Sequence, residues 1–254
     1  MKSAYSPGLP MGNTDDETPR AAPTATTDAF YKFVLSLCGL CKGRPLYFKG
    51  IEDYLLEKLP GVRYLTRIRC LNYSMDCRHW EESFQQGSFS ESAVAQKLDL
   101  QMSGIQSSDL TTMRDMNVIR YDREYLQHCC PTSSCIRRAS DRAPVAWIMC
   151  HADLEMGAML TTDGYRRRGL AKYIVHDLGT KMMQVFADRI SLLYSDDPRE
   201  YDFKLQMVTE LTNSNTRRLF EQLGFRPVAN VSWAECVFDH QQYQAQQRGS
   251  NPRL

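Results

Sequence analysis

The chain has 254 residues and a formal net charge of +1, with 31 basic and 30 acidic side chains. This balance gives the whole molecule no electrostatic reason to seek nucleic acid or an acidic membrane surface. No apolar run approaches the ~18 residues that a membrane-spanning helix needs. We therefore expect a soluble globular protein with one large domain or two small ones.

The number of cysteines, nine, is odd, and no leading segment resembles a secretory signal, so we expect free thiols in a reducing compartment. Cys38-x-x-Cys41 with Cys70 and Cys77 is the alternative, a zinc site, but the second pair is too widely spaced for a zinc knuckle. We expect no metal. The acidic residues at 15–17 disfavour a mitochondrial transit peptide only weakly, which leaves cytoplasm and mitochondrion open.

Taken in order, residues 1–28 are poor in large apolar side chains and are predicted to be disordered. Residues 29–96 are predicted to form a small N-terminal α/β region, with a helix over Leu46–Leu59 and a strand over Val62–Leu71. Trp80 lies four residues before Phe84, a spacing more typical of packing than of ligand stacking.

Residues 97–240 are predicted to form the main domain, and residues 241–254 a frayed tail. Asp109 is expected near the N-terminus of the first helix of this domain. The predicted elements are a strand at Lys97–Met102, a helix after Asp109, a second amphipathic segment at Tyr121–Cys130, strands at Ser134–Ala139, Pro144–Cys150 and Glu155–Thr162, a helix at Leu170–Phe186, a strand at Phe203–Thr209, a helix at Thr216–Leu223 and a strand at Val231–Phe238.

The segment from Glu155 to Ala171, EMGAMLTTDGYRRRGLA, joins a strand to a helix through a basic, glycine-containing loop. Unpaired backbone N–H groups and the positive end of the helix dipole converge at such a place, which predicts an anion site for phosphate. A solvated run of arginines is the competing interpretation.

Arg166-x-x-Gly169-x-Ala171 resembles the pyrophosphate-binding loop of the GNAT acyltransferase superfamily, and the element order from residue 97 resembles the order of that fold. Asn213 and Asn215, just before the helix that ends in Leu-Gly-Phe, resemble the family's second cofactor segment. The resemblance implies an α/β fold with a mixed, mostly antiparallel sheet flanked by helices, and acyl-CoA or acetyl-CoA as co-substrate. It implies that the cofactor contacts Leu160, Thr161, Thr162, Arg166, Arg167, Arg168, Gly169, Leu170, Ala171, Asn213 and Asn215.

Within the superfamily, Ala143–Trp147 (APVAW) and Glu155-Met156 before Thr162-x-x-Tyr165-Arg166 resemble the glycine N-acyltransferase-like group. Thr162-Asp163-Gly164 departs from that group's usual Leu-Pro-Glu, which leaves the acceptor open. Phe220 stands where many GNAT enzymes have a tyrosine that protonates the leaving thiolate, so another residue supplies that proton or the thiolate leaves unaided.

The resemblance makes Glu155 the expected general base for acyl transfer, with an exposed, inert glutamate as the alternative. His151 is the second candidate base, and Cys150 a disfavoured nucleophile because it lies in an apolar strand. We expect a monomeric enzyme that acylates glycine or another small amine from acyl-CoA. The alternative is a CoA-binding GNAT-like protein that acts as a peptide N-acetyltransferase or as a non-catalytic regulator.

Overall fold

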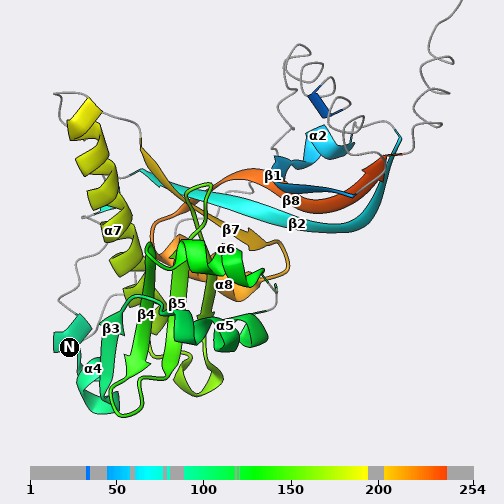
Figure 1. The fold of residues 1–254 in the computed structure, drawn as a ribbon. Coiled ribbons are helices and arrows are strands. Elements are labelled where there is room, and N and C mark those ends of the chain that lie inside the picture. Colours follow the sequence, from blue (N-terminus) through cyan, green and yellow to red (C-terminus); the bar gives the residue numbers. More distant parts are fainter. Residues whose placement is uncertain are drawn as a thin grey trace, which may run out of the picture.

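The computed structural model describes residues 33–34, 45–57, 61–76, 79–80, 89–117, 119, 121–193 and 203–238. These residues form an eight-stranded sheet in the order β1-β8-β2-β7-β6-β5-β4-β3, in which β6 and β7 are parallel and the other neighbours antiparallel (Figure 1). The expected fold class, a mixed and mostly antiparallel sheet flanked by helices, is confirmed.

The strands are β1 (Leu46–Glu52), β2 (Val62–Asp76), β3 (Leu100–Ser103), β4 (Ser133–Arg138), β5 (Pro144–Cys150), β6 (Glu155–Thr161), β7 (Lys204–Glu210) and β8 (Arg226–Phe238). The helices are α2 (Asp53–Glu57), α4 (Ala93–Leu98), α5 (Leu110–Met116), α6 (Arg123–Cys129), α7 (Leu170–Leu193) and α8 (Ser214–Gln222). No helix in the described ranges is long and apolar enough to cross a membrane.

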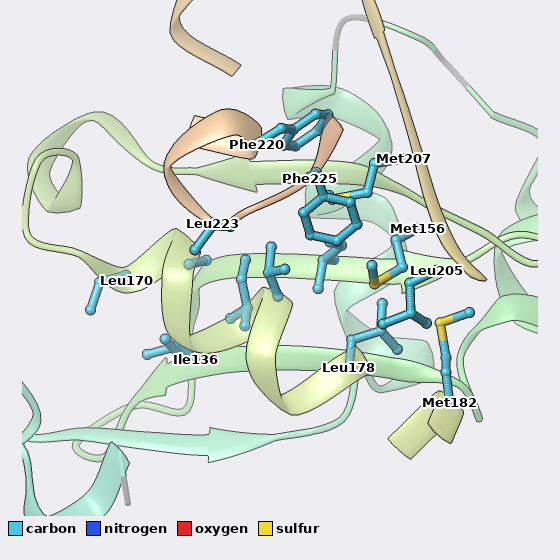
Figure 2. Close-up of a cluster of buried hydrophobic side chains, with 14 of the residues drawn as sticks. Ile136, Met156, Leu170, Leu178, Met182, Leu205, Met207, Phe220, Leu223 and Phe225 are labelled. Atoms are coloured by element: carbon cyan, nitrogen blue, oxygen red, sulfur yellow. The ribbon is translucent and has the colours of Figure 1, made fainter. Parts of the chain in front are cut away.

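Helices α7 and α8 pack on one face of the sheet. Helix α7 presents an apolar stripe that is buried at Leu170, Ile174, Leu178 and Met182, whereas Val185 is 53% exposed, so the buried stripe ends before it. These side chains meet Met156 and Met207 of the central strands and Phe220 of α8 in one apolar cluster (Figure 2). Burial of this cluster is the main force that holds α7 and α8 to the sheet.

Helices α5 and α6 cover the other face, where their apolar residues pack against Cys135, Trp147 and Met149. The buried Arg137 of β4 ties this layer to the sheet, with its guanidinium nitrogens 2.8 and 2.5 Å from the two carboxylate oxygens of Asp109. Asp109 therefore has a partner on a strand in addition to its place beside a helix start.

Two sequence expectations are wrong in the N-terminal half. Residues 46–52 form strand β1 rather than the start of a helix, because they pair with β8 while Leu46, Phe48 and Ile51 pack around a separate small cluster. A short apolar run fits the periodicity of a helix and that of a strand, and only the presence of a partner strand decides between the two structures. Lys97 belongs to α4, which Asp99 closes in a left-handed conformation before β3 begins.

Strand β2 runs between β7 and β8, so β1 and β2 share the sheet with the strands after residue 97. The domain boundary near residue 96 stays a prediction. The expectations for residues 1–28 and 241–254, and for Cys38, Cys41, Cys77 and Phe84, concern residues outside the described ranges. Trp80 is buried against helix α7, which supports its packing role.

Candidate active site

A cavity of about 230 Å³ opens where the parallel strands β6 and β7 separate. Their pairing covers only Glu155 with Gln206 and Met156 with Met207. Beyond Met156 the β7-facing backbone of β6 has no ladder partner among the described strands, so its polar groups are available to a ligand. The cavity is lined by Asn117, Ile119, Tyr121, Met156, Gly157, Ala158, Met159, Leu160, Met207, Val208, Thr209, Glu210, Asn213, Thr216, Phe220 and Trp233.

A bulge shapes the cavity wall formed by β6. Trp147 pairs with Leu160 and Met149 with Gly157, so two residues of β6 lie opposite one residue of β5. Ala158 in the bulge has φ of +49°, a conformation that non-glycine residues adopt rarely. Such strain is common at functional sites, where a bulge redirects backbone groups.

Glu155 begins β6 and is 8% exposed, so the exposed alternative is wrong. One carboxylate oxygen lies 3.0 Å from Nζ of Lys49 on β1, and the same ammonium lies 2.7 Å from Asp153. Burial raises the pKa of Glu155, and the Lys49 ammonium only partly opposes this effect. A carboxylate with a raised pKa is a better proton acceptor than an ordinary glutamate.

His151 is buried, and its Nδ1 lies 2.7 Å from the Tyr125 hydroxyl. Burial, with a smaller effect of Lys49, lowers the pKa of His151 to about 4. The imidazole is therefore neutral at pH 7 and a weak base, which favours Glu155 for proton transfer. The other edge of the ring packs on Gly157, where an added Cβ would lie 2.5 Å from Nε2.

Tyr121 packs near His151 and also faces the cavity. Its ring centre is 5.3 Å from that of His151, and the residue lines the cavity. Burial, followed by the negative charge of Glu155, raises the pKa of Tyr121 to about 12. The phenol is thus protonated at neutral pH and lies within the field of the Glu155 carboxylate.

The basic loop follows β6 directly. Arg166 donates from Nε to the Thr161 carbonyl (3.0 Å) and forms an exposed ion pair with Asp163 (3.1 Å). Arg167 and Arg168 are exposed and form no ion pair within the described part of the chain. Gly169 has φ of +78° and open space beside its Cα, and α7 begins at the next residue with no acid in its first turn. An anion would meet little electrostatic competition here.

The remaining predicted cofactor residues divide between cavity and surroundings. Leu160 and Asn213 line the cavity, and Asn213 also caps α8 by accepting a hydrogen bond from the Thr216 amide (3.2 Å). Asn215 is exposed and does not line it. Thr161, Thr162, Leu170 and Ala171 are likewise absent from its wall, and the buried Leu170 side chain belongs to the core, so only its backbone could contact a ligand.

Cys150 is a poor nucleophile, since burial raises the pKa of its thiol to about 11. Sequence reasoning missed Lys49, Asn117, Tyr121 and Trp233 as site residues. They come from three separate segments, β1 for Lys49, the α5–α6 connection for Asn117 and Tyr121, and β8 for Trp233, and no local motif marks them.

No family model and no curated protein sequence matches the chain. Among solved structures, a Drosophila protein superimposes with a TM-score of 0.56 at 14% identity, over 78% of this chain and 61% of that one. A putative acetyltransferase of the GNAT family from Novosphingobium aromaticivorans superimposes with a TM-score of 0.52 at 16% identity, over 80% and 79%. The chain thus spans about 61% of the length of the Drosophila protein. These similarities show a GNAT-type fold.

Proposed function

We propose that this protein is an N-acyltransferase that moves an acyl group from a coenzyme A thioester to the amine of glycine or another small acceptor. The observation that carries this proposal is the buried Glu155, whose pKa is raised, at the start of the strand whose unpaired edge lines the cavity. The fold is shared with a putative acetyltransferase, which supports the same reaction class.

The acceptor amine attacks the thioester carbonyl carbon and forms the C–N bond, while the carbonyl oxygen becomes an oxyanion. Backbone N–H groups along the separated edge of β6 are suited to stabilise this charge. The C–S bond then breaks, the thiolate leaves, and the ammonium proton passes to Glu155 directly or through water. No metal takes part in these steps.

Coenzyme A would be held along the end of strand β6 and at the N-terminus of helix α7. The backbone of Leu160–Thr162 would contact the pantetheine arm, and the loop Arg166–Ala171 would receive the diphosphate at the α7 N-terminus. Asn213 and Asn215 would contact the arm from the side of α8. The open left-handed Gly169 and the exposed Arg167 and Arg168 support this arrangement.

A second candidate is a CoA-binding protein that regulates or acts on peptides. It is favoured by Phe220, which presents a ring without an ionisable group to the cavity. Under the enzyme proposal the thiolate must therefore leave unaided or receive its proton from a group outside α8.

Thiol release from acetyl-CoA and benzoyl-CoA tests the proposal, with glycine, other amino acids, polyamines and a peptide amine as acceptors. In Glu155→Gln we expect kcat/KM to fall about 10²- to 10⁴-fold, the usual contribution of a general base, with an unchanged Kd for coenzyme A. Glu91→Gln, an exposed carboxylate on a remote turn, is the matched control.

Full activity in Glu155→Gln would show that another group accepts the proton. Tight coenzyme A binding without turnover on any acceptor would instead favour the second candidate. Failure of the wild type to bind coenzyme A would exclude both.

A further inference from the structure

Two buried N–H donors in the cavity wall have no hydrogen-bond partner in the described structure, Nδ2 of Asn117 and Nε1 of Trp233. Asn117 is 9% exposed, and it is its backbone N–H that caps α5 by donating to the Met113 carbonyl, so the cap leaves the side-chain Nδ2 without a partner. Buried polar groups are nearly always paired, and an unpaired one is costly. A ligand oxygen is the kind of partner that each donor lacks.

The two donors reach the cavity from distant parts of the sequence. Asn117 follows α5 and Trp233 lies on β8, yet both line the same space. Trp147 makes a useful contrast, because its indole N–H is also buried and unpaired, but Trp147 belongs to the core beneath α5 and α6 and is not among the residues that line the cavity. Convergence on one cavity is therefore what distinguishes Asn117 and Trp233.

Asn117 lies on the acceptor's expected side of the cavity. Phe220, Thr216 and Asn213 come from α8, beside the proposed coenzyme A loop. Asn117 and Tyr121 come from the connection between α5 and α6, on the opposite face of the sheet. The influence of Glu155 on Tyr121 puts the candidate base near this second group.

The chemistry of the wall favours a neutral oxygen. Both donors are uncharged, and Glu210 carries the only formal charge among the described residues that line the cavity. With Glu155 close by, a second carboxylate brought in by the acceptor would meet like charge. A carbonyl oxygen accepts the same hydrogen bonds without that repulsion.

We propose that Asn117 and Trp233 bind the neutral carbonyl oxygen of an acceptor whose amine lies beside that carbonyl, as in an amino-acid amide or a peptide N-terminus. This inference rests on the proposed function and narrows its acceptor from small amines in general to α-amino carbonyl compounds. It predicts a higher kcat/KM for glycinamide than for glycine.

The first test compares kcat/KM for glycinamide with that for isobutylamine, which has a similar shape but no carbonyl, and for glycine. The wild type should prefer glycinamide to glycine. The glycinamide-to-isobutylamine ratio should fall about tenfold in Trp233→Phe and in Asn117→Leu, because each removes one donor. The intrinsic difference in amine basicity cancels when variant and wild-type ratios are compared.

Trp147→Phe is the matched control, since it removes an unpaired indole N–H outside the cavity and should leave the ratio unchanged. The Kd of coenzyme A should also stay unchanged in both cavity variants. Neither variant should lower the urea midpoint by more than the lost packing explains, because no internal hydrogen bond is broken.

Calorimetric binding of glycinamide to the coenzyme A complex tests the donors without turnover. About tenfold weaker binding in Trp233→Phe supports the inference even if no acyl transfer occurs, which would count against the proposed function alone. Equal glycinamide binding and an equal glycinamide-to-isobutylamine ratio in all variants would overturn the inference. If acyl transfer were still observed in that case, the proposed function would stand. A weakened coenzyme A Kd with an unchanged ratio, or a wild-type preference for glycine, would also overturn it.

Discussion

Lys49 sits between two carboxylates that respond to it in different ways. Burial would raise the pKa of Asp153, but its hydrogen bond and charge interaction with Lys49, together with a hydrogen bond from the Glu155 amide, outweigh burial and hold that pKa below the usual range. For Glu155, burial outweighs Lys49 and the pKa is raised. Neighbouring acids whose pKa values are pushed apart take different roles, so Asp153 anchors the ammonium and Glu155 is the better base.

Lys49→Met should move the acidic limb of the pH profile of kcat/KM to higher pH. Loss of the ammonium removes the interaction that lowers the pKa of Glu155, so the carboxylate stays protonated, and unable to accept a proton, up to a higher pH. Lys97→Met, which removes an exposed charge on α4, should leave the limb in place. A limb that stays put or moves to lower pH in Lys49→Met would exclude Glu155 as the group that titrates.

The site residues that sequence could predict are those whose signal is local. Glu155 and the loop from Arg166 to Ala171 lie on one continuous strand–loop–helix segment, and the structure places that segment at the cavity or next to it. Lys49 and Trp233 reach the site from β1 and β8, strands that are far from Glu155 in the chain but share its sheet. Their roles depend on strand order, which no motif encodes.

At the scale of elements, the strand and helix limits that sequence predicts well again depend on local sequence, and those that it predicts wrongly depend on a partner strand. Strands β4, β5 and β6 begin and end within about a residue of their expected limits, because turns bound them and their burial follows their own sequence. Residues 46–59 have apolar side chains that fit a helix or a strand. Pairing with β8 selects the strand for Leu46–Glu52, whereas Asp53–Glu57 form helix α2. The splay of β6 from β7, which creates the cavity, is likewise a property of two strands together.

The contact between His151 and Gly157 holds the bulged strand β6 against β5. Gly157→Ala would put a Cβ 2.5 Å from Nε2 and 2.7 Å from Cδ2 of His151, a ring that the Tyr125 hydroxyl and the ring of Tyr121 hold in place. We expect the free energy of unfolding, measured with urea, to fall by about 1–3 kcal/mol through overpacking. Activity should fall as well, because Gly157 lines the cavity.

A double-mutant cycle isolates this contact. In a His151→Ala background, Gly157→Ala should cost much less than in the wild type, since the clashing ring is gone. Gly164→Ala is the control, because nothing lies within 4 Å of the added Cβ. Equal costs of Gly157→Ala in both backgrounds would show that the His151 ring does not set the limit.

At the scale of the molecule, β2 joins the N-terminal part of the described chain to its last two strands, β7 and β8. It pairs with β7 from Cys70 to Asp76 and with β8 from Val62 to Ser74, so it fills the gap that β7 and β8 would otherwise leave. Tyr73 and Met75 of β2 are buried in the same cluster as α7 and α8. The strand therefore contributes to the core that positions the site, although it precedes the predicted main domain.

Deletion of residues 1–76 should abolish folding of the remainder. It would expose the paired edges of β7 and β8, and loss of the buried Tyr73 and Met75 alone costs about 5 kcal/mol or more, comparable with the 5–15 kcal/mol of a typical domain. Soluble expression and urea unfolding measure this. Deletion of residues 1–28, the segment predicted to be disordered, is the control and should leave the urea midpoint unchanged.

Co-expression of residues 1–80 in trans should restore a soluble complex, because β2 would again pair with β7 and β8. A stable, cooperatively unfolding fragment from residue 77 onward would show that the later strands form an independent domain and that β2 is an accessory to it.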